Sequence, residues 1–355
     1  MKFSLGLDRF SGLYIGALFI IVFSFWAPQT FPTMSTMHIL ASTQSIAGLV
    51  ALALLIPMVA GQFDLSIGAT ANLAGITAVI VQNNGQLGPI PALILGTLIG
   101  TFIGIVNGFI IVKLKVNSFI ATLGMSSIIL AFLVIVTGGV EAPPVENPAF
   151  GRLTQTQIFG FQSVIIYLIV LALLIWWILE RTPAGRYLRA TGGNPEAARL
   201  TGISVDRWAW LSLIASGTIC GFAGVLFVSL TGPSLEFGSS LLLPAFAAVF
   251  LGSTQLSPGK MNVWGTIIAI FVLAIGVQGL QLVTGVQWVA AMFNGVALIL
   301  AVALAVGRTR RTSSKGGKSK SDDGVTVSEP EERLDGLGVD EPATSAVDLL
   351  SDDKN

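Results

Sequence analysis

The chain has 355 residues, of which 53% are hydrophobic and only 11% are charged. Soluble domains carry roughly 25% charged residues, so this composition excludes an ordinary soluble protein and indicates an integral membrane protein. Nineteen basic and nineteen acidic residues cancel, which makes their placement along the chain more informative than their sum.

Ten apolar blocks, taken in chain order, predict an all-α membrane protein with about ten transmembrane helices. They cover residues 12–26, 45–60, 66–81, 91–112, 118–137, 163–179, 208–230, 241–251, 263–282 and 287–306. Several are shorter than the roughly 20 residues that a perpendicular helix needs to cross the hydrocarbon. We therefore expect some of these helices to be broken or re-entrant.

The first block follows Lys2 and Arg9, which is also how a signal peptide begins. The block ends in "WAPQTFPTM", which contains no small-residue cleavage pattern. The better interpretation is a first span that is retained.

The positions of Lys and Arg support ten crossings and set an orientation. With a cytoplasmic N-terminus, the bases of the inter-span loops lie inside, and only Arg152 lies in an outside loop. Moving a single span would put the basic stretch around Arg186 and Arg199 on the other face. We expect both termini in the cytoplasm and His38 in the first outside loop.

The chain changes character after Val306, where a polar segment without aromatic residues begins, first basic and then acidic. This composition is typical of a disordered tail. The sequence therefore predicts a polytopic transmembrane domain over residues 1–311 and a disordered cytoplasmic tail over residues 312–355.

Two similar stretches suggest an inverted repeat of about five spans: "LGTLIGTFIGIVNGFIIVKL" from Leu95 and "WGTIIAIFVLAIGVQGLQLV" from Trp264. In the predicted topology they cross the membrane in opposite directions. The first stretch also carries glycines at every fourth position, on one helical face, which favours close approach of a neighbouring helix. These are Gly96, Gly100, Gly104 and Gly108.

Residue types for catalysis or metal binding are scarce. One histidine, His38, and one cysteine, Cys220, give neither a metal cluster nor a nucleophile pair, and Cys220 is expected to be a small core residue. The "KGGKS" stretch near Lys318 lacks the first glycine and the preceding strand of a phosphate-binding loop. We expect no catalytic residue, metal or cofactor, and any nucleotide hydrolysis belongs to another chain.

Asp64, in "GQFDLSIG", is the most conspicuous residue of the predicted spans. A carboxylate costs on the order of 3 kcal/mol at the bilayer centre, so it needs water, a partner or a helix N-terminus. Asp64 can cap a helix that begins near Leu65 and Ser66. Alternatively, residues 61–68 form an unwound segment that faces a solute pathway.

Further polar side chains on the spans allow two interpretations. They can form hydrogen bonds between helices, or they can donate to and accept from a neutral polyhydroxylated solute. With Asp64, the pathway candidates are Ser66, Asn72, Asn107, Asn117, Ser118, Gln278, Gln281 and Asn294.

The stretch "GGNPEAARLTGIS", residues 192–204, predicts a short capped helix in a cytoplasmic loop. Asn194 is a favourable N-cap, Pro195 suits the first helical position, and Glu196 suits the positive end of the helix dipole. Gly202 can supply the left-handed residue that ends the helix. Such strong start and stop signals predict a stiff helix. One alternative for its role is a helix that lies on lipid headgroups.

Four stretches resemble sugar-type permease subunits of bacterial ABC importers, the group that includes the ribose permease. They are "AGQFDLSIGATANLAG", "NGFIIVKLKVNSFIATLGMSSI", "RTPAGRYLRATGGNPEAARLTGIS" and "FAAVFLGST", in that order. The resemblance extends to about residue 311 and leaves the predicted tail outside.

The resemblance implies a permease subunit of the bacterial inner membrane that forms a translocation pathway for a monosaccharide or related polyol. It implies three kinds of protein partner: a second permease, which is most simply a copy of this chain; a cytoplasmic ATPase pair; and an extracytoplasmic solute-binding protein. The permease would also contact membrane lipid, and no nucleic acid is implied. It also makes the helix at about residues 194–202 a coupling helix held in a groove of the ATPase. The coupling residues would be Asn194, Pro195, Glu196, Ala197, Ala198, Arg199, Leu200 and Gly202.

Within that helix we expect Glu196, Arg199 and Leu200 to touch the ATPase, while Ala197 and Ala198 permit close approach. One departure is Gln62 and Phe63 before Asp64, where the family usually has a glycine and an isoleucine, so the solute need not be ribose. The alternatives are an ion-coupled secondary transporter, a permease for another solute such as a branched-chain amino acid, and a membrane assembly protein without transport.

Overall fold

The computed structural model describes residues 7–85, 87–158, 160–257 and 259–316, with side chains described between residues 11 and 305. The chain divides into two units, residues 1–312 and 313–355, and the architecture below is that of the first. The last helix continues to Gly316, beyond the predicted start of the tail. The remainder of the predicted tail lies outside the described residues.

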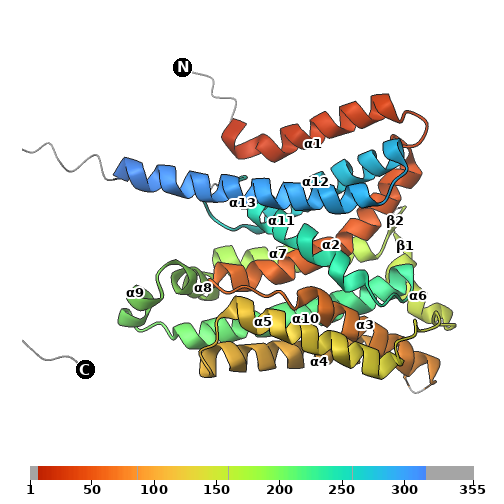
Figure 1. Ribbon diagram of the computed structural model, residues 1–355, viewed down its shortest axis with the longest axis horizontal. Helices are drawn as coiled ribbons and strands as arrows, with labels where there is room; N and C mark the ends of the chain where they lie inside the picture. Colours follow the sequence, from red (N-terminus) through yellow and green to blue (C-terminus); the bar gives the residue numbers. More distant parts are fainter. Residues whose placement is uncertain (1–6, 86, 159, 258, 317–355) are drawn as a thin grey trace, which may run out of the picture. The chain divides into compact units, whose positions relative to one another are not determined.

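The described part is almost entirely helical (Figure 1). Its helices are α1 (Leu7–Trp26), α2 (Met34–Val59), α3 (Ile67–Asn83), α4 (Pro89–Gly108), α5 (Ser118–Thr137), α6 (Pro148–Gln155), α7 (Val164–Arg181), α8 (Pro183–Gly193), α9 (Pro195–Leu200), α10 (Val205–Thr231), α11 (Phe237–Gly252), α12 (Val263–Thr284) and α13 (Trp288–Gly316). A π-helical turn, η1 (Phe109–Lys113), extends α4, and β1 (Gln157–Ile158) pairs antiparallel with β2 (Phe161–Gln162).

Each of the ten predicted apolar blocks coincides with one helix, so the prediction of an all-α membrane protein is confirmed. Seven helices of the described part are long and apolar enough to cross a membrane: α2, α4 with η1, α5, α7, α10, α12 and α13. Three apolar helices of the described part are shorter than 18 residues: α3, α11 and Ser11–Trp26, which is the apolar part of α1. Ten complete crossings therefore remain a prediction.

One local prediction is corrected by the structure, and three local elements were not predicted. α2 begins at Met34, where Thr33 caps it by accepting a hydrogen bond from the Thr36 amide, so His38 lies inside α2 and not in a loop. Its ring packs edge-on against Phe161 of the hairpin, with 4.9 Å between centroids. The amphipathic helices α6 and α8 and the hairpin were not predicted, because they contain no long apolar run.

The core forms around α2, whose residues from Ser45 to Val59 are all buried. The predicted glycine face of α4 is confirmed, because it packs against α10. A Cβ atom on Gly100 would lie 2.2 Å from the Gly217 carbonyl oxygen, and one on Gly104 would lie 2.5 Å from that of Leu213. Only glycine allows this approach of the two backbones.

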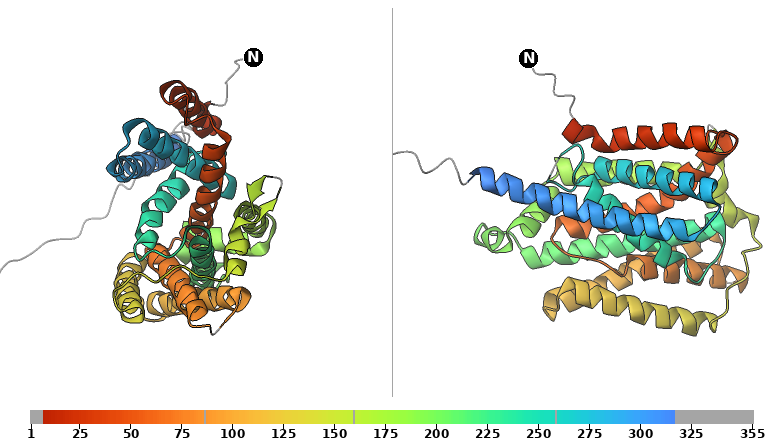
Figure 2. Two further views of the ribbon diagram at one scale, coloured as in Figure 1. Left: turned by 90° about the vertical axis from the view of Figure 1, so that its right-hand side faces the viewer. Right: turned by 45° about the horizontal axis from the view of Figure 1, so that its top comes forward.

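Two helices, α3 and α11, begin inside the bundle after non-helical segments, 60–66 and 232–236, which we call the first and second broken segments. The two helix starts touch, because a Cβ atom on Gly68 would lie 2.1 Å from the Gly238 carbonyl oxygen. α3 and α11 then run to opposite ends of the bundle (Figures 1 and 2). The expectation that some helices are broken or re-entrant in the membrane stays a prediction, which these two helix starts support.

The two ends of the bundle differ in charge. One end, the α9 end, holds α8, α9 and the loops 114–117 and 253–262 (Figure 1). Lys115, Arg189, Arg199 and Lys260 lie on these elements. The other end, the α6 end, carries Arg152 on α6. The structure thus gathers at one end bases that are far apart in the sequence.

Candidate functional site

The predicted short helix is present as α9, with the expected caps. The Asn194 side chain accepts a hydrogen bond from the Ala197 amide at 3.0 Å, and Gly202 has a φ of +85°. The Gly202 amide donates to the Arg199 carbonyl and the Ile203 amide to the Ala198 carbonyl, at 3.0 and 3.1 Å. This pair of bonds is a Schellman motif, which fixes the C-terminal end of the helix.

α9 exposes one face and buries the other. Leu200 is 90% exposed, whereas Ala198 is 5% exposed and faces its own chain, where α9 packs against α8 and α10. The expectation that Ala198 lets a partner approach is therefore wrong. Glu196, Ala197 and Leu200 are exposed and remain available to a partner.

Arg199 has a partner within the chain. Its guanidinium donates to Asp206 Oδ1 at 2.8 Å, and Lys115 Nζ lies 3.0 Å from Asp206 Oδ2. Asp206 stands in the first turn of α10, where a carboxylate is also favoured by the helix dipole. This carboxylate links α9, the start of α10 and the loop between η1 and α5.

Asp64 lies at the centre of a buried polar network. Its side chain is 2% exposed and accepts three hydrogen bonds: from the Ser66 amide at 3.1 Å, from Ser66 Oγ at 2.7 Å and from Ser216 Oγ of α10 at 2.8 Å. Asn107 of α4 donates to Ser66 Oγ at 2.8 Å. The helix starts at Ile67 with Ser66 at the N-cap position. Asp64 therefore lies outside the helix and accepts a hydrogen bond from the amide of the N-cap residue, Ser66.

Hydroxyl groups of α5 bind the backbone of the first broken segment. Ser118 Oγ accepts from the Phe63 amide at 3.1 Å, and Thr122 Oγ1 accepts from the Leu65 amide at 3.0 Å. These bonds satisfy donors that an unwound backbone leaves free inside a membrane protein. Gln62 is half-buried and Phe63 is exposed.

The second broken segment is organised differently. Ser234 and Glu236 flank Leu235, and the Glu236 amide donates to Ser234 Oγ at 3.4 Å. The Leu235 carbonyl accepts a hydrogen bond from Asn72 Nδ2 of α3. Glu236 is exposed and occupies the N-cap position of α11.

A cavity of about 430 Å³ lies where α3, α5 and α11 meet. Its polar lining comes from Asn72, Ser126, Glu236 and Ser239, and its walls include Leu130 and Leu242. A concave site with mostly apolar walls and a few polar groups is the usual form of a small-molecule site. Of the predicted pathway residues, Asn72 lines this cavity, and Asp64 and Ser66 flank Leu65, which also lines it.

Other predicted pathway residues lie elsewhere. Asn117 is exposed and caps α5 by accepting from the Phe119 amide at 2.9 Å. Gln278 and Gln281 are half-buried on α12, and Asn294 is half-buried on α13. α12 and α13 lie on the far side of α2 from α4 and α5 in both views (Figures 1 and 2), so the structure does not bring these three amides to the cavity.

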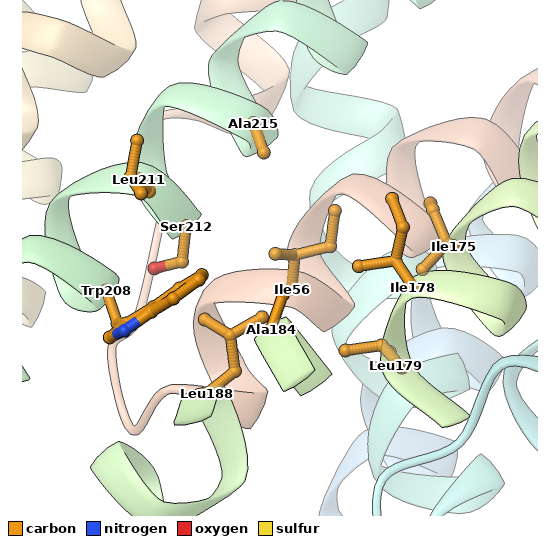
Figure 3. A pocket seen from close by; sticks show the side chains of 10 residues that line it. All are labelled: Ile56, Ile175, Ile178, Leu179, Ala184, Leu188, Trp208, Leu211, Ser212 and Ala215. Carbon is orange, nitrogen blue, oxygen red and sulfur yellow. The ribbon is translucent and has the colours of Figure 1, made fainter. Parts of the chain in front are cut away.

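A second cavity, of about 160 Å³, lies between α2, α7, α8 and α10 (Figure 3). Its lining is carbon except at Ser212, whose hydroxyl donates to the Ala209 carbonyl at 2.7 Å, and at the indole of Trp208. An apolar lining of this kind suits hydrocarbon and not a polar solute.

Five polar residues of the site were missed by the sequence reasoning: Thr122, Ser126, Ser216, Glu236 and Ser239. Thr122 and Ser216 are ordinary hydroxyl residues on apolar helices, and only the fold brings them to the first broken segment. Glu236 carries a sequence signal, because "DLSIG" at residues 64–68 has a counterpart in "SLEFG" at residues 234–238. The acidic residue and the serine have exchanged places around a shared leucine.

The described residues contain no group of acidic, His or Cys side chains that could hold a metal, and Cys220 is buried. Broken helices that meet inside an apolar bundle, beside a partly polar cavity, define a polytopic membrane transport protein. A family model described as branched-chain amino acid transport system / permease component matches residues 36–303. The chain belongs to this family, and it is a transport permease subunit rather than an enzyme.

Known import permeases are similar to the chain over most of their length. The fructose import permease of Rhizobium meliloti is 30% identical over 82% of this chain and 83% of its own. The ribose import permease of Bacillus subtilis is 30% identical over 84% of this chain and 92% of its own. The autoinducer 2 import system permease LsrD of Escherichia coli is 30% identical over 74% and 80%.

Proposed function

We propose that the chain is the permease subunit of an ATP-driven importer and forms the pathway for a monosaccharide or related polyol. The observation that supports this best is the similarity to ribose, fructose and autoinducer 2 import permeases over most of the chain. The cavity between α3, α5 and α11 is the candidate pathway, because it offers hydroxyl, amide and carboxylate groups to a hydroxylated solute.

A separate cytoplasmic ATPase pair hydrolyses ATP and transmits its conformational change to the permease through α9. A doubly capped helix with an exposed leucine at its tip can occupy a groove of a partner and transmit displacement, which a flexible loop would absorb. Arg199 supports this role indirectly, since its ion pair with Asp206 ties α9 to α10. α10 in turn carries Ser216, which binds Asp64.

The α9 end then faces the cytoplasm, in agreement with its basic residues. The α6 end faces the extracytoplasmic binding protein that delivers the solute. A pair of permeases, most simply a homodimer, completes the importer in the cell membrane, with both termini in the cytoplasm.

An inverted repeat underlies this architecture in our proposal. The interval from Ile67 to Phe237, the first residues of α3 and α11, equals the interval from Ser118 to Trp288, the first residues of α5 and α13. The helices α2 to α5 and α10 to α13 thus follow in the same order, and the two broken segments occupy corresponding places. Opposite directions of α3 and α11 support a twofold axis in the membrane plane.

The test is reconstitution of the full-length chain with its ATPase and binding protein in proteoliposomes. We expect uptake of radiolabelled ribose or fructose that requires ATP and does not respond to a proton uncoupler. Uptake that continues without the ATPase and collapses with the uncoupler would establish the ion-coupled transporter instead. Uptake of leucine in place of the sugars would establish a branched-chain amino acid permease.

The role of α9 is tested by Leu200→Glu, which changes an exposed side chain and leaves the caps intact. We expect normal insertion, loss of ATPase co-purification and at least about a tenfold loss of uptake, as for removal of an apolar anchor from an interface. The matched control is Leu114→Glu, since Leu114 is also exposed at the α9 end but lies outside α9. Normal ATPase binding by Leu200→Glu would contradict the coupling role.

A further inference from the structure

The cavity between α3, α5 and α11 is lined by one carboxylate, that of Glu236. Among the described residues, the Glu236 side chain has no ion-pair or hydrogen-bond partner, although its backbone is bonded. Glu236 is exposed toward this cavity and stands two residues before Gly238, which contacts Gly68. An unpaired carboxylate in a membrane protein requires a functional or a solvated environment.

A second, independent feature points to a ligand at the same place. Asn72 lines the cavity and is 1% exposed, and its amide nitrogen is used by the Leu235 carbonyl. Its Oδ1 atom is buried and has no hydrogen-bond partner. A buried acceptor without a donor destabilises the protein, and a ligand hydroxyl that donates to it would remove that cost.

The cavity therefore presents mainly acceptors. The Glu236 carboxylate and the Asn72 carbonyl accept only, while the hydroxyl groups of Ser126 and Ser239 can both accept and donate. Such a lining matches a solute rich in hydroxyl donors. It does not match an anionic solute, because a second negative charge would lie in the same partly apolar cavity as Glu236.

We propose that Glu236 is a specificity-determining residue that accepts hydrogen bonds from neighbouring hydroxyl groups of a neutral sugar or polyol and disfavours its phosphorylated form. The proposal rests on the proposed function, because it assigns the solute of that pathway. A carboxylate has two oxygen atoms and can receive two adjacent hydroxyl groups at once. Asn72 Oδ1 then accepts a further hydroxyl of the same molecule.

The test uses a cysteine reporter in the cavity. Ser239→Cys places a thiol on an exposed cavity residue of the full-length chain, and the native Cys220 is buried and should not react. Maleimide labelling in membranes is measured with D-ribose, D-fructose or ribose 5-phosphate present. We expect at least one of the neutral sugars to slow labelling and ribose 5-phosphate to be much less effective.

Adding Glu236→Gln to the reporter should raise the sugar concentration for half-protection about tenfold, as expected for loss of charge-assisted hydrogen bonds. It should also reduce the difference between ribose and ribose 5-phosphate. The matched control is Glu146→Gln, the same change at an exposed acid in the loop between α5 and α6, outside the cavity. This control should leave protection unchanged.

Equal protection with and without Glu236→Gln, or no protection of the parent reporter by either sugar, would overturn the assignment. The labelling needs neither ATP nor the binding protein, so it reports on the cavity alone. Suppose that ATP-driven uptake fails but the sugars still protect the reporter in a way that depends on Glu236. This result would refute the proposed importer and would leave the proposed solute site in place. The two proposals can thus fail separately.

Discussion

The two broken segments use the same elements in different ways. Each contains a leucine flanked by an acidic residue and a serine, and each leads into a helix that starts at the Gly68 and Gly238 contact. In the first segment the acid precedes the leucine and is buried, with three hydrogen bonds. In the second the acid follows the leucine and lines the cavity.

The acidic residue and the serine exchange places around the leucine, and the role of the carboxylate differs with its place. In the first segment it binds other groups of the protein, and in the second it is available to a ligand. Asp64, before Leu65, is buried and bonded to Ser66 and Ser216, whereas Glu236, after Leu235, is exposed and lines the cavity. Asp64 therefore holds α10 through Ser216, whereas Glu236 is left without a protein partner among the described residues. Three predictions test the contrast, beginning with the largest effect.

Removal of the two carboxylates should have unequal effects on stability. Asp64→Ala leaves the Ser66 amide, Ser66 Oγ and Ser216 Oγ without their acceptor, which should lower the free energy of unfolding by about 3 kcal/mol or more. Glu236→Ala removes no protein hydrogen bond and should leave stability unchanged within error. The measurement is thermal unfolding of the detergent-purified chain, monitored by size-exclusion chromatography.

Asp64→Asn keeps one oxygen acceptor and serves as the milder variant if Asp64→Ala does not fold. We expect its free energy of unfolding to lie between that of the wild type and that of Asp64→Ala, since an amide oxygen can still accept from Ser66. If Glu236→Ala unfolds as readily as Asp64→Ala, the division of roles between the two segments is wrong.

The contact between the two helix starts should tolerate no side chain. Gly68→Ala and Gly238→Ala would each put a Cβ atom 2.1–2.2 Å from a backbone carbonyl oxygen, and backbone cannot move as a side-chain end can. We expect a loss of about 1–3 kcal/mol in the free energy of unfolding for each. Gly124→Ala on α5 is the matched control, because no atom lies within 4 Å of its Cβ position. Equal unfolding temperatures for all three variants would show that the helix starts are not in contact.

Much of this architecture was predictable, because hydrophobic blocks and caps are local signals. The ten blocks mark ten helices, and Asn194, Pro195 and Gly202 specify α9 with both its ends. The four-residue glycine spacing predicted the close packing of α4, although it did not identify α10 as the partner.

The site itself depends on contacts between distant segments, and these leave little local signal. Thr122 and Ser216 matter because α5 and α10 pass beside the first broken segment. Glu236 was hidden because its segment looks like an outside loop between two apolar blocks. Gln278, Gln281 and Asn294 show the reverse case, since polar residues on spans do not reveal which face of a helix meets the cavity.

The smallest expected effect concerns the hydroxyl groups of α5. Thr122→Val keeps the shape of the side chain but removes the acceptor of the Leu65 amide, 3.0 Å away. One amide of the first broken segment then loses its partner, which should cost about 1 kcal/mol of stability. Ser234→Ala in the second segment removes only the long 3.4 Å bond from the Glu236 amide, and solvent in the cavity can replace it, so we expect no measurable change. Thr97→Val is the matched control for the first variant, because the Thr97 hydroxyl bonds only the Leu93 carbonyl of its own helix. The same unfolding measurement applies, and a larger loss for Ser234→Ala than for Thr122→Val would mean that the second segment, and not the first, depends on its hydroxyl partners.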